Sequence, residues 1–349
     1  MEGLTVDKFR FSSPTVYTKI MSQPFLALPR PGTIQTQQLV TIAAPKEADF
    51  VSTFGQLLPS ASYLSTKYGK AAYYSIPPTS KASNGAKEDP ISRVLMVHGV
   101  QTCAIGLQPL AKTLSSRFPH AHIVLVDLWG HGLTDAPVTP YEPALFHFLL
   151  ESLMTHLHWD NAHFIGYSFG GSTVATFASV KRHLVSSLIL VAPAGLMRMS
   201  QFTPQEQTWL RGDSSVTEQE AQKQVMIWLE DGPLVVPPNW KERVSRGEVV
   251  AEAVKEWQMV NHEGHAASVV AVVRDGGVFD MHEGFKRAAG TGVRNFSVLG
   301  ELDPICSVSD LKDVGFENVV MVNAAGHGVV REQVSEVARH IEEFWTGLG

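Results

Sequence analysis

A serine stands between two glycines directly after an apolar, strand-like run. The stretch reads Gly166-Tyr167-Ser168-Phe169-Gly170, follows the apolar residues 162–165 and precedes a run of small residues. A sharp turn from strand to helix forces such a serine into a strained backbone conformation and exposes its hydroxyl, an arrangement known as a nucleophile elbow. The positions two residues to either side leave no room for a Cβ, and Gly166 and Gly170 meet that demand. The stretch therefore predicts a strand, a reactive serine and a helix in succession.

The segments around this turn alternate between strand and helix patterns. A helix is predicted at 171–179, and buried strands are predicted at 93–97, 123–126 and 187–191. Two earlier runs, 62–66 and 71–76, predict an antiparallel hairpin that starts the sheet. Strand, loop, helix and strand is the repeating unit of a parallel sheet, so we expect an α/β protein.

Four motifs together resemble the α/β-hydrolase fold superfamily over roughly residues 60–349. They are His98-Gly99, the loop at 127–135, the turn around Ser168 and the late pair Gly326-His327. The resemblance implies a mostly parallel eight-stranded sheet flanked by helices, an inserted helical cap and serine hydrolase chemistry. It says less about the substrate, because this fold hosts many activities.

The chain divides into four expected parts. Residues 1–55, broken by several prolines, form an N-terminal extension that is either an arm over the site or a surface segment. Residues 56–195 and 282–349 are the two halves of the hydrolase core, and 196–281 are a helical cap. The cap is expected because about a hundred residues separate two strands, far more than an ordinary connection. Within it, helices are predicted at 203–211, 217–229 and 241–260.

Serine chemistry needs a base and an acid, and the resemblance implies the order serine, acid, histidine. A strand at 318–323 leads to His327, which we expect to be the general base. An earlier strand, 296–299, leads to Asp303, our expected acid, with Glu301 as the rival. Some relatives place the acid after the strand that ends here at residue 191, but 192–195 contains no carboxylate.

Further site residues follow from the resemblance. The backbone N–H groups of Val100 and Phe169 should form the oxyanion hole that stabilises negative charge during acyl transfer. Trp129, Tyr167 and Trp228 are candidate pocket residues, each with core packing as the alternative. The sequence gives His262 and His265 no third ligand, and it has no glycine-rich phosphate loop, so neither a metal nor another cofactor is expected.

Composition excludes other classes of protein. The net charge is −6 and the two signs are mixed along the chain, so no basic stripe is available for nucleic acid. No apolar run approaches the ~20 residues that span a bilayer, and the N-terminus lacks a basic and then apolar leader. Two cysteines in 349 residues are no disulfide framework. We therefore expect a cytoplasmic protein without a membrane span, of undetermined oligomeric state.

The leading functional hypothesis is hydrolysis of an ester, thioester or lactone bond in a small-to-medium apolar acyl compound, through an acyl-enzyme on Ser168. The acyl group could be linked to a carrier or to CoA. Two alternatives stay open: a free-standing thioesterase or acyltransferase that releases or cyclises a polyketide-like chain, and a C–C bond hydrolase. A different class is a ligand receptor without turnover on the same fold. Epoxide hydrolases and dehalogenases need a carboxylate where this chain has Ser168.

Overall fold

An eight-stranded sheet forms the centre of the protein. The computed structural model describes residues 25–33, 39–80, 91–212 and 215–348. Its strand order is β10-β9-β8-β7-β4-β5-β3-β2. The strands are β2 (Ser62–Thr66), β3 (Gly69–Ile76), β4 (Arg93–Val97), β5 (His122–Val126), β7 (Ala162–Tyr167), β8 (Val185–Val191), β9 (Arg294–Gly300) and β10 (Val319–Val322).

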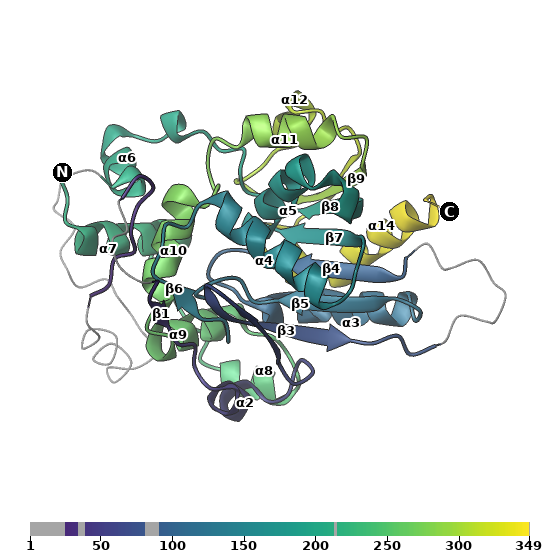
Figure 1. Ribbon diagram of the computed structural model, residues 1–349, viewed down its shortest axis with the longest axis horizontal. Helices are drawn as coiled ribbons and strands as arrows, with labels where there is room; N and C mark the ends of the chain where they lie inside the picture. Colours follow the sequence, from purple (N-terminus) through teal and green to yellow (C-terminus); the bar gives the residue numbers. More distant parts are fainter. Residues whose placement is uncertain (1–24, 34–38, 81–90, 213–214, 349) are drawn as a thin grey trace.

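The sheet is mostly parallel, as predicted. Strand β3 pairs antiparallel with β2 and β5, and every other neighbouring pair is parallel. The hairpin expected at the start of the sheet is therefore present as β2 and β3. The expected α/β class with an eight-stranded sheet is confirmed (Figure 1).

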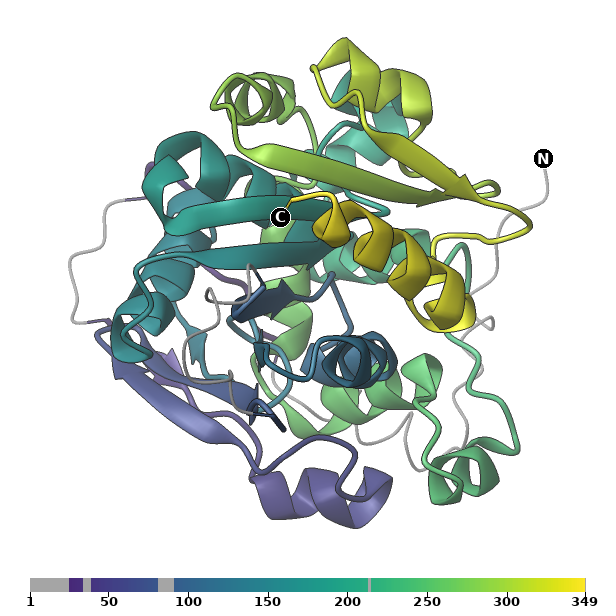
Figure 2. The same cartoon turned by 90° about the vertical axis from the view of Figure 1, so that its right-hand side faces the viewer.

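Helices cover both faces of the sheet (Figure 2). Leu95 and Val97 of β4 join the core on the side of α4 (Pro143–His156), α5 (Phe169–Val180) and α11 (His282–Ala289). Val94 and Met96 join the core on the side of α3 (Gln108–Arg117) and α14 (Val334–Thr346). Successive side chains of a strand point to opposite faces, so a strand buried on both sides is a continuous apolar run.

A long insertion between β8 and β9 carries most of the remaining helices. They are α6 (Pro204–Arg211), α7 (Glu218–Leu229), α8 (Trp240–Ser245), α9 (Ala251–Asn261) and α10 (His265–Asp275), followed by α11 of the core. Figure 1 shows α6, α7, α9 and α10 together beyond one end of the central strands. The sequence predicted helices close to α6 and α7, each starting one residue early at a capping threonine.

The single helix predicted at 241–260 is wrong, because the structure has two helices there. Helix α8 ends at Ser245 and α9 begins at Ala251. Between them Gly247 has φ +82°, a left-handed conformation that glycine adopts readily and that ends a helix. Helix α10 was not predicted. We propose that α6 to α10, within the expected range 196–281, form the cap, and we use that name for them below.

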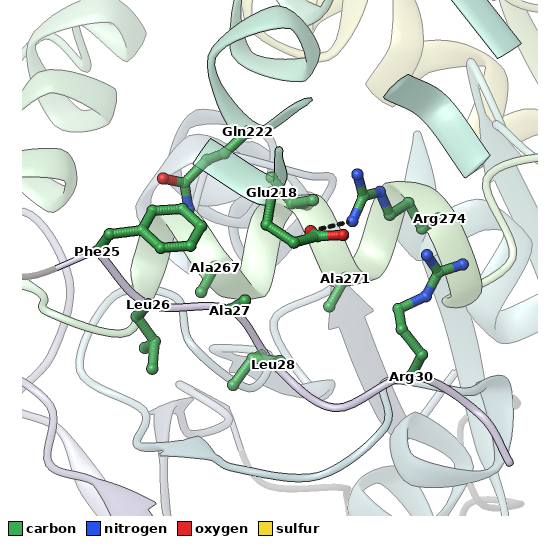
Figure 3. Close-up of a pocket in the computed structure, with 11 residues that line it drawn as sticks. Phe25, Leu26, Ala27, Leu28, Arg30, Glu218, Gln222, Ala267, Ala271 and Arg274 are labelled. Atoms are coloured by element: carbon green, nitrogen blue, oxygen red, sulfur yellow. Dashed lines mark hydrogen bonds and ion pairs between the residues drawn. The ribbon is translucent and has the colours of Figure 1, made fainter. Parts of the chain in front are cut away.

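The N-terminal extension is described only from Phe25, and residues 1–24 of the predicted extension lie outside the described residues. Residues 25–30 run beside the cap helices α7 and α10 (Figure 3). The Arg30 guanidinium donates to both carboxylate oxygens of Asp275, at 2.6 and 2.9 Å, and to the carbonyl of Arg211. This part of the extension therefore fastens the cap, and none of the described residues 25–33 lines the cavity at Ser168 that is described below.

Short elements complete the described chain. They are β1 (Thr41–Ile42), which pairs antiparallel with β6 (Ala136–Pro137), the helices α2 (Glu47–Phe54), α12 (Val308–Asp313) and α13 (Val329–Glu332), and 3-10 turns at Ala104–Leu107, Arg182–Leu184 and Met199–Gln201. Among the helices of the described ranges, none is both long enough and apolar enough to cross a membrane.

Candidate active site

Ser168 occupies the sharp turn between β7 and α5. Its backbone has φ 55° and ψ −121°, a conformation that non-glycine residues rarely adopt. Several hydrogen bonds hold it there: Ser168 N donates to Val191 O at 3.0 Å, and Ser168 O accepts from Gly171 N at 2.8 Å and Ala194 N at 2.9 Å. The strain is therefore balanced by fixed backbone contacts on both sides of the turn.

The two glycines of the turn are required by close packing. A Cβ on Gly170 would collide with the carbonyl oxygen of Val97, and a Cβ on Gly166 would collide with the carbonyl of Gly170. Gly99 faces the same turn, since a Cβ there would lie 2.7 Å from the Ser168 Cβ. The loop after β4 thus lies directly against the serine.

Three side chains from distant parts of the sequence form a hydrogen-bonded chain. His327 Nε2 lies 2.9 Å from Ser168 Oγ, and His327 Nδ1 lies 3.0 Å from Asp303 Oδ2. The Asp303 side chain is fully buried, whereas that of His327 is 32% exposed. The second carboxylate oxygen of Asp303 accepts from Ile305 N at 2.9 Å. The imidazole is therefore held between a hydroxyl and a carboxylate that is itself fixed.

Glu301, the rival acid, contacts the backbone of a neighbouring loop and not the imidazole of His327. Its Oε2 accepts from the backbone N–H of Ala324 at 2.8 Å, and the residue is exposed. Glu301 fastens the loop between β10 and His327 to the loop after β9. Of the two carboxylates, the structure brings Asp303 to the imidazole.

The expected oxyanion donors lie on both sides of Ser168. Phe169 is the first residue of α5, with Ser168 as its N-cap, and Val100 follows the Gly99 that faces the serine. Within the described residues, neither backbone N–H has a hydrogen-bond partner. The first N–H groups of a helix carry partial positive charge, which suits a developing oxyanion. The Phe169 side chain is buried against Phe146, so only its backbone can face the site.

A cavity of about 820 Å³ opens onto Ser168 and His327. Its volume falls in the range of small-molecule sites, roughly 300–1,000 Å³. Core loops form one side and the cap forms the other. The apolar lining residues include Met197, Phe202, Trp228, Leu229, Val278 and Ile305, and the charged ones are Glu206, Glu230, Asp231, Lys255, Arg331 and Glu332.

The three candidate pocket residues have different locations. Trp228 lines the cavity and packs against Phe202 and Phe279, with ring centroids 5.8 and 5.6 Å away. Tyr167 also lines the cavity, and its hydroxyl donates to His327 O at 3.1 Å. Burial raises the pKa of that phenol. Trp129 is not a pocket residue: it is fully buried, is absent from the lining, and donates its indole N–H to Leu145 O at 3.4 Å.

A buried polar network supports the loop after β4, and no sequence motif predicted it. Gln101 has φ 63°, and both of its backbone polar groups are bonded to side chains from elsewhere. Gln258 Nε2 of the cap donates to Gln101 O at 2.7 Å, and the Gln101 N–H donates to His131 Nε2 at 3.3 Å. Gln258 Oε1 also accepts from Gly132 N at 2.6 Å. A cap residue thus fixes the residue next to Val100.

Four buried histidines form part of this support. Their rings lie in a row in space, in the order His98, His131, His265 and His262. The centroids of neighbouring rings are 5.3, 4.9 and 6.2 Å apart. Each bonds to a backbone carbonyl, respectively of Gly99, Trp129, Gly130 and Thr134. Burial lowers the pKa of all four, to about 4 for His98 and about 3 for His265. These rings are therefore neutral links between the core loops and the cap.

Within the described ranges, no set of three or more histidine, cysteine, aspartate or glutamate side chains could hold a metal ion. Both cysteines are buried and free. Burial raises the pKa of the Cys103 thiol, whose loop packs beside Asp127.

Comparison with known proteins agrees with this fold. The family model described as alpha/beta hydrolase fold matches residues 93–233. A 2-(acetamidomethylene)succinate hydrolase of Mesorhizobium japonicum is 32% identical over 98 residues, which cover 28% of this chain and 34% of that protein. The monoacylglycerol lipase abhd6-A of Xenopus laevis is 30% identical over 139 residues, covering 38% and 39%.

Solved structures extend the likeness to most of the chain. The crystal structure of a hydrolase from Pseudomonas aeruginosa PA01 superposes with a TM-score of 0.58 at 20% identity, over 82% of this chain and 98% of that one. By sequence, the chain matches only 30 to 39% of the length of its curated relatives. The family model, the sheet order and this superposition together show that the chain has the alpha/beta hydrolase fold.

Proposed function

We propose that the protein is a serine hydrolase that cleaves an ester, thioester or lactone bond through an acyl-enzyme on Ser168. One observation carries the proposal: the continuous chain of contacts from Ser168 Oγ to His327 to Asp303, with distances of 2.9 and 3.0 Å. A serine hydroxyl is a weak nucleophile at neutral pH unless a base takes its proton. Here the base is in contact with the hydroxyl and is oriented by a buried carboxylate.

In the proposed first step, Ser168 Oγ attacks the carbonyl carbon of the substrate while His327 Nε2 takes the hydroxyl proton. Asp303 holds the Nδ1 proton and stabilises the imidazolium. The negative charge that develops on the carbonyl oxygen is stabilised by the N–H groups of Val100 and Phe169, and each such donor is worth about 3–4 kcal/mol of barrier. His327 then gives its proton to the leaving group, and an acyl-enzyme remains.

In the second step His327 takes a proton from water, which attacks the acyl-enzyme carbonyl. The same two N–H groups stabilise the second tetrahedral intermediate, and its collapse releases the acid and restores Ser168. Exposure of the His327 side chain, at 32%, is consistent with water reaching this position. If an alcohol or amine of the substrate attacks instead, the outcome is acyl transfer or cyclisation.

The cavity supports a small-to-medium substrate with both an apolar and a polar part. Phe202 and Trp228 offer an apolar wall for an acyl chain, and Phe279 packs against both of them. Trp228 belongs both to the lining and to the packing of the cap. The charged residues of the lining make a purely apolar substrate a poor fit. Among the relatives, one is named for a succinate derivative and another for monoacylglycerols. We therefore place no limit on the leaving group, and a carrier-linked or CoA-linked acyl group remains within the proposal.

The test is covalent trapping at Ser168. A fluorophosphonate probe should label Ser168 and no other serine, and a nitrophenyl ester should be hydrolysed. The mass of the group attached to Ser168 after brief exposure to panels of thioesters, esters and lactones would name the substrate class. Labelling without turnover of any panel member would favour a receptor, and absence of labelling would overturn the proposal. Cleavage of a vinylogous diketone with no acyl-enzyme would favour C–C hydrolysis.

A further inference from the structure

One cation in the cavity at Ser168 has no carboxylate partner in the part of the chain that the structure describes. Arg331, on the short helix α13 that follows His327, lines the cavity together with Ser168 and His327. Its guanidinium lies over the ring of Tyr167, with Cζ 5.4 Å from the ring centroid. Tyr167 immediately precedes Ser168 and its hydroxyl bonds to His327 O. The arginine is thus attached to the wall of the cavity beside the proposed nucleophile.

The hydrogen-bond donors of Arg331 are incompletely used. Within the described residues, no ion pair joins its guanidinium to a carboxylate. The Arg331 side chain forms a hydrogen bond with the Tyr167 side chain, but its buried Nη1 atom has no hydrogen-bond partner. A charged donor that has lost its water and gained no acceptor is unfavourable, so such a group usually marks a place where a ligand supplies the acceptor.

The second cation of the cavity shows the opposite situation. Lys255 Nζ contacts both carboxylate oxygens of Glu230, at 2.8 and 3.0 Å, and both side chains are largely buried. Among the acids of the lining, Glu206 accepts from Thr203, while Asp231 and Glu332 are exposed to water. The positive charge of Lys255 is therefore already neutralised, and that of Arg331 is available.

We propose that Arg331 binds a free carboxylate of the substrate, so that the natural substrates are esters or thioesters whose acyl group carries a second, ionised carboxyl group. The inference rests on the proposed function and names its substrate class. A guanidinium suits this role because its planar N–H groups match a carboxylate and its face can stay on an aromatic ring. The guanidinium of Arg331 lies over the Tyr167 ring, and its buried Nη1 has no partner among the described residues.

The test compares pairs of substrates that differ only in charge. The 4-nitrophenyl monoesters of adipic, pimelic and suberic acid are each compared with the ester in which a methyl ketone replaces the free carboxylate. For adipate the neutral partner is 4-nitrophenyl 6-oxoheptanoate. The measured quantity is the ratio of kcat/KM for the carboxylate ester to that for the ketone ester. The wild-type protein should have a ratio well above one for at least one chain length.

Replacing Arg331→Gln should lower this ratio roughly 10- to 100-fold, because a hydrogen bond to a charged group is lost for one substrate only. Arg331→Lys should keep part of the ratio, since it keeps the charge. Arg243→Gln is the matched control, because Arg243 pairs with Glu248 and lies outside the described lining of the cavity. A wild-type ratio near one, or a parallel loss on both substrates of a pair in Arg331→Gln, would overturn the inference.

A binding measurement separates this inference from the proposed chemistry. In a Ser168→Ala protein, calorimetry with monomethyl adipate and with methyl 6-oxoheptanoate reports the anion site without turnover. Tighter binding of the monomethyl adipate that disappears when Arg331→Gln is added supports the site even if no ester is hydrolysed. Equal binding of both compounds overturns it, even if Ser168 is an active nucleophile.

Discussion

The Gln258 carboxamide of the cap donates to the backbone carbonyl of Gln101 at 2.7 Å, across 157 positions of sequence. The same side chain accepts from Gly132 N at 2.6 Å, so one amide joins α9 to two loops of the core. Because Gln101 follows Val100, the contact fixes the position of a proposed oxyanion donor. In the proposed mechanism the cap therefore helps to position an oxyanion donor, in addition to enclosing the cavity.

Replacing Gln258→Met should lower kcat by roughly 10- to 100-fold while KM changes little, since an oxyanion donor acts mainly in the transition state. Two buried backbone groups also lose their partners, and each loss costs about 1–3 kcal/mol of stability. Steady-state kinetics and thermal unfolding measure the two effects. Gln224→Met on α7 is the matched control and should alter neither, because among the described residues the Gln224 amide bonds to the exposed Glu220 alone. An unchanged kcat in a destabilised Gln258→Met protein would reduce the contact to a structural one.

Ser168→Ala and His327→Ala should each reduce kcat by roughly 10⁴- to 10⁶-fold, and the double variant should lose no more than either single one. The reason is that the hydroxyl and the imidazole, 2.9 Å apart, act as one unit. Circular dichroism should show a folded protein in each case. If the fold-reduction in kcat of the double variant equals the product of the two single reductions, the assignment of the triad is contradicted.

Asp303→Asn should lower kcat by about 10⁴-fold, because an amide beside His327 Nδ1 favours the wrong tautomer and cannot stabilise an imidazolium. Glu301→Gln is the matched carboxylate-to-amide control. It should cost much less, since Glu301 contacts the backbone of Ala324. Kinetics on one nitrophenyl ester is sufficient for both variants. A larger loss in Glu301→Gln would mean that the acid has been misassigned.

Trp228→Ala should change the preference among acyl chains of different length more than it lowers the rate on an acetate ester. Trp228 forms part of the apolar wall, and its contacts contribute binding that a very small acyl group does not use. Trp240→Ala provides the same truncation outside the described lining, where Trp240 packs on Phe54. Specificity profiles over C2 to C10 esters test the difference. A uniform loss in Trp228→Ala would show that the residue only holds the cap together.

The free energy of unfolding should fall as the pH is lowered from about 6.5 towards 4. His98, His131, His262 and His265 stay neutral in the folded state because burial lowers their pKa, whereas in the unfolded chain they bind protons below about 6.5. Each such group contributes up to about 1.4 kcal/mol per pH unit within this window.

Asp127 opposes this trend, because burial raises its pKa to about 6, so its ionisation in the unfolded state favours unfolding as the pH rises. The combined effect of the four histidines on the free energy of unfolding should be larger than the opposite effect of the one carboxyl group. Urea titrations at pH 7.5, 6 and 5 measure the net slope. His265→Asn, which removes one of the four, should make the slope smaller. A free energy of unfolding that is constant from pH 7.5 to 5 would contradict this account.

Local patterns in the sequence determined the fold and the order of the reactive residues. Apolar runs fix the strands because side chains buried on both faces leave no polar alternation. The glycines around Ser168 fix the turn because backbone atoms of Val97 and Gly170 fill the space of a Cβ. Loops after strand ends fix where Asp303 and His327 emerge, since the carboxyl ends of parallel strands meet at one edge of the sheet. All of these constraints act within a few residues or through the topology of a known fold.

Only the tertiary structure decided which of Asp303 and Glu301 meets the imidazole, that Trp129 lies in the core, and that the helix predicted at 241–260 breaks near Gly247. It alone showed Gln258 bonded to Gln101, and Arg331 beside Tyr167 with an unused donor. The physical reason is the range of the contacts. A glutamine or an arginine on a helix has the same local pattern whether it faces water, a loop or a substrate, and its partner is chosen by segments more than a hundred residues away.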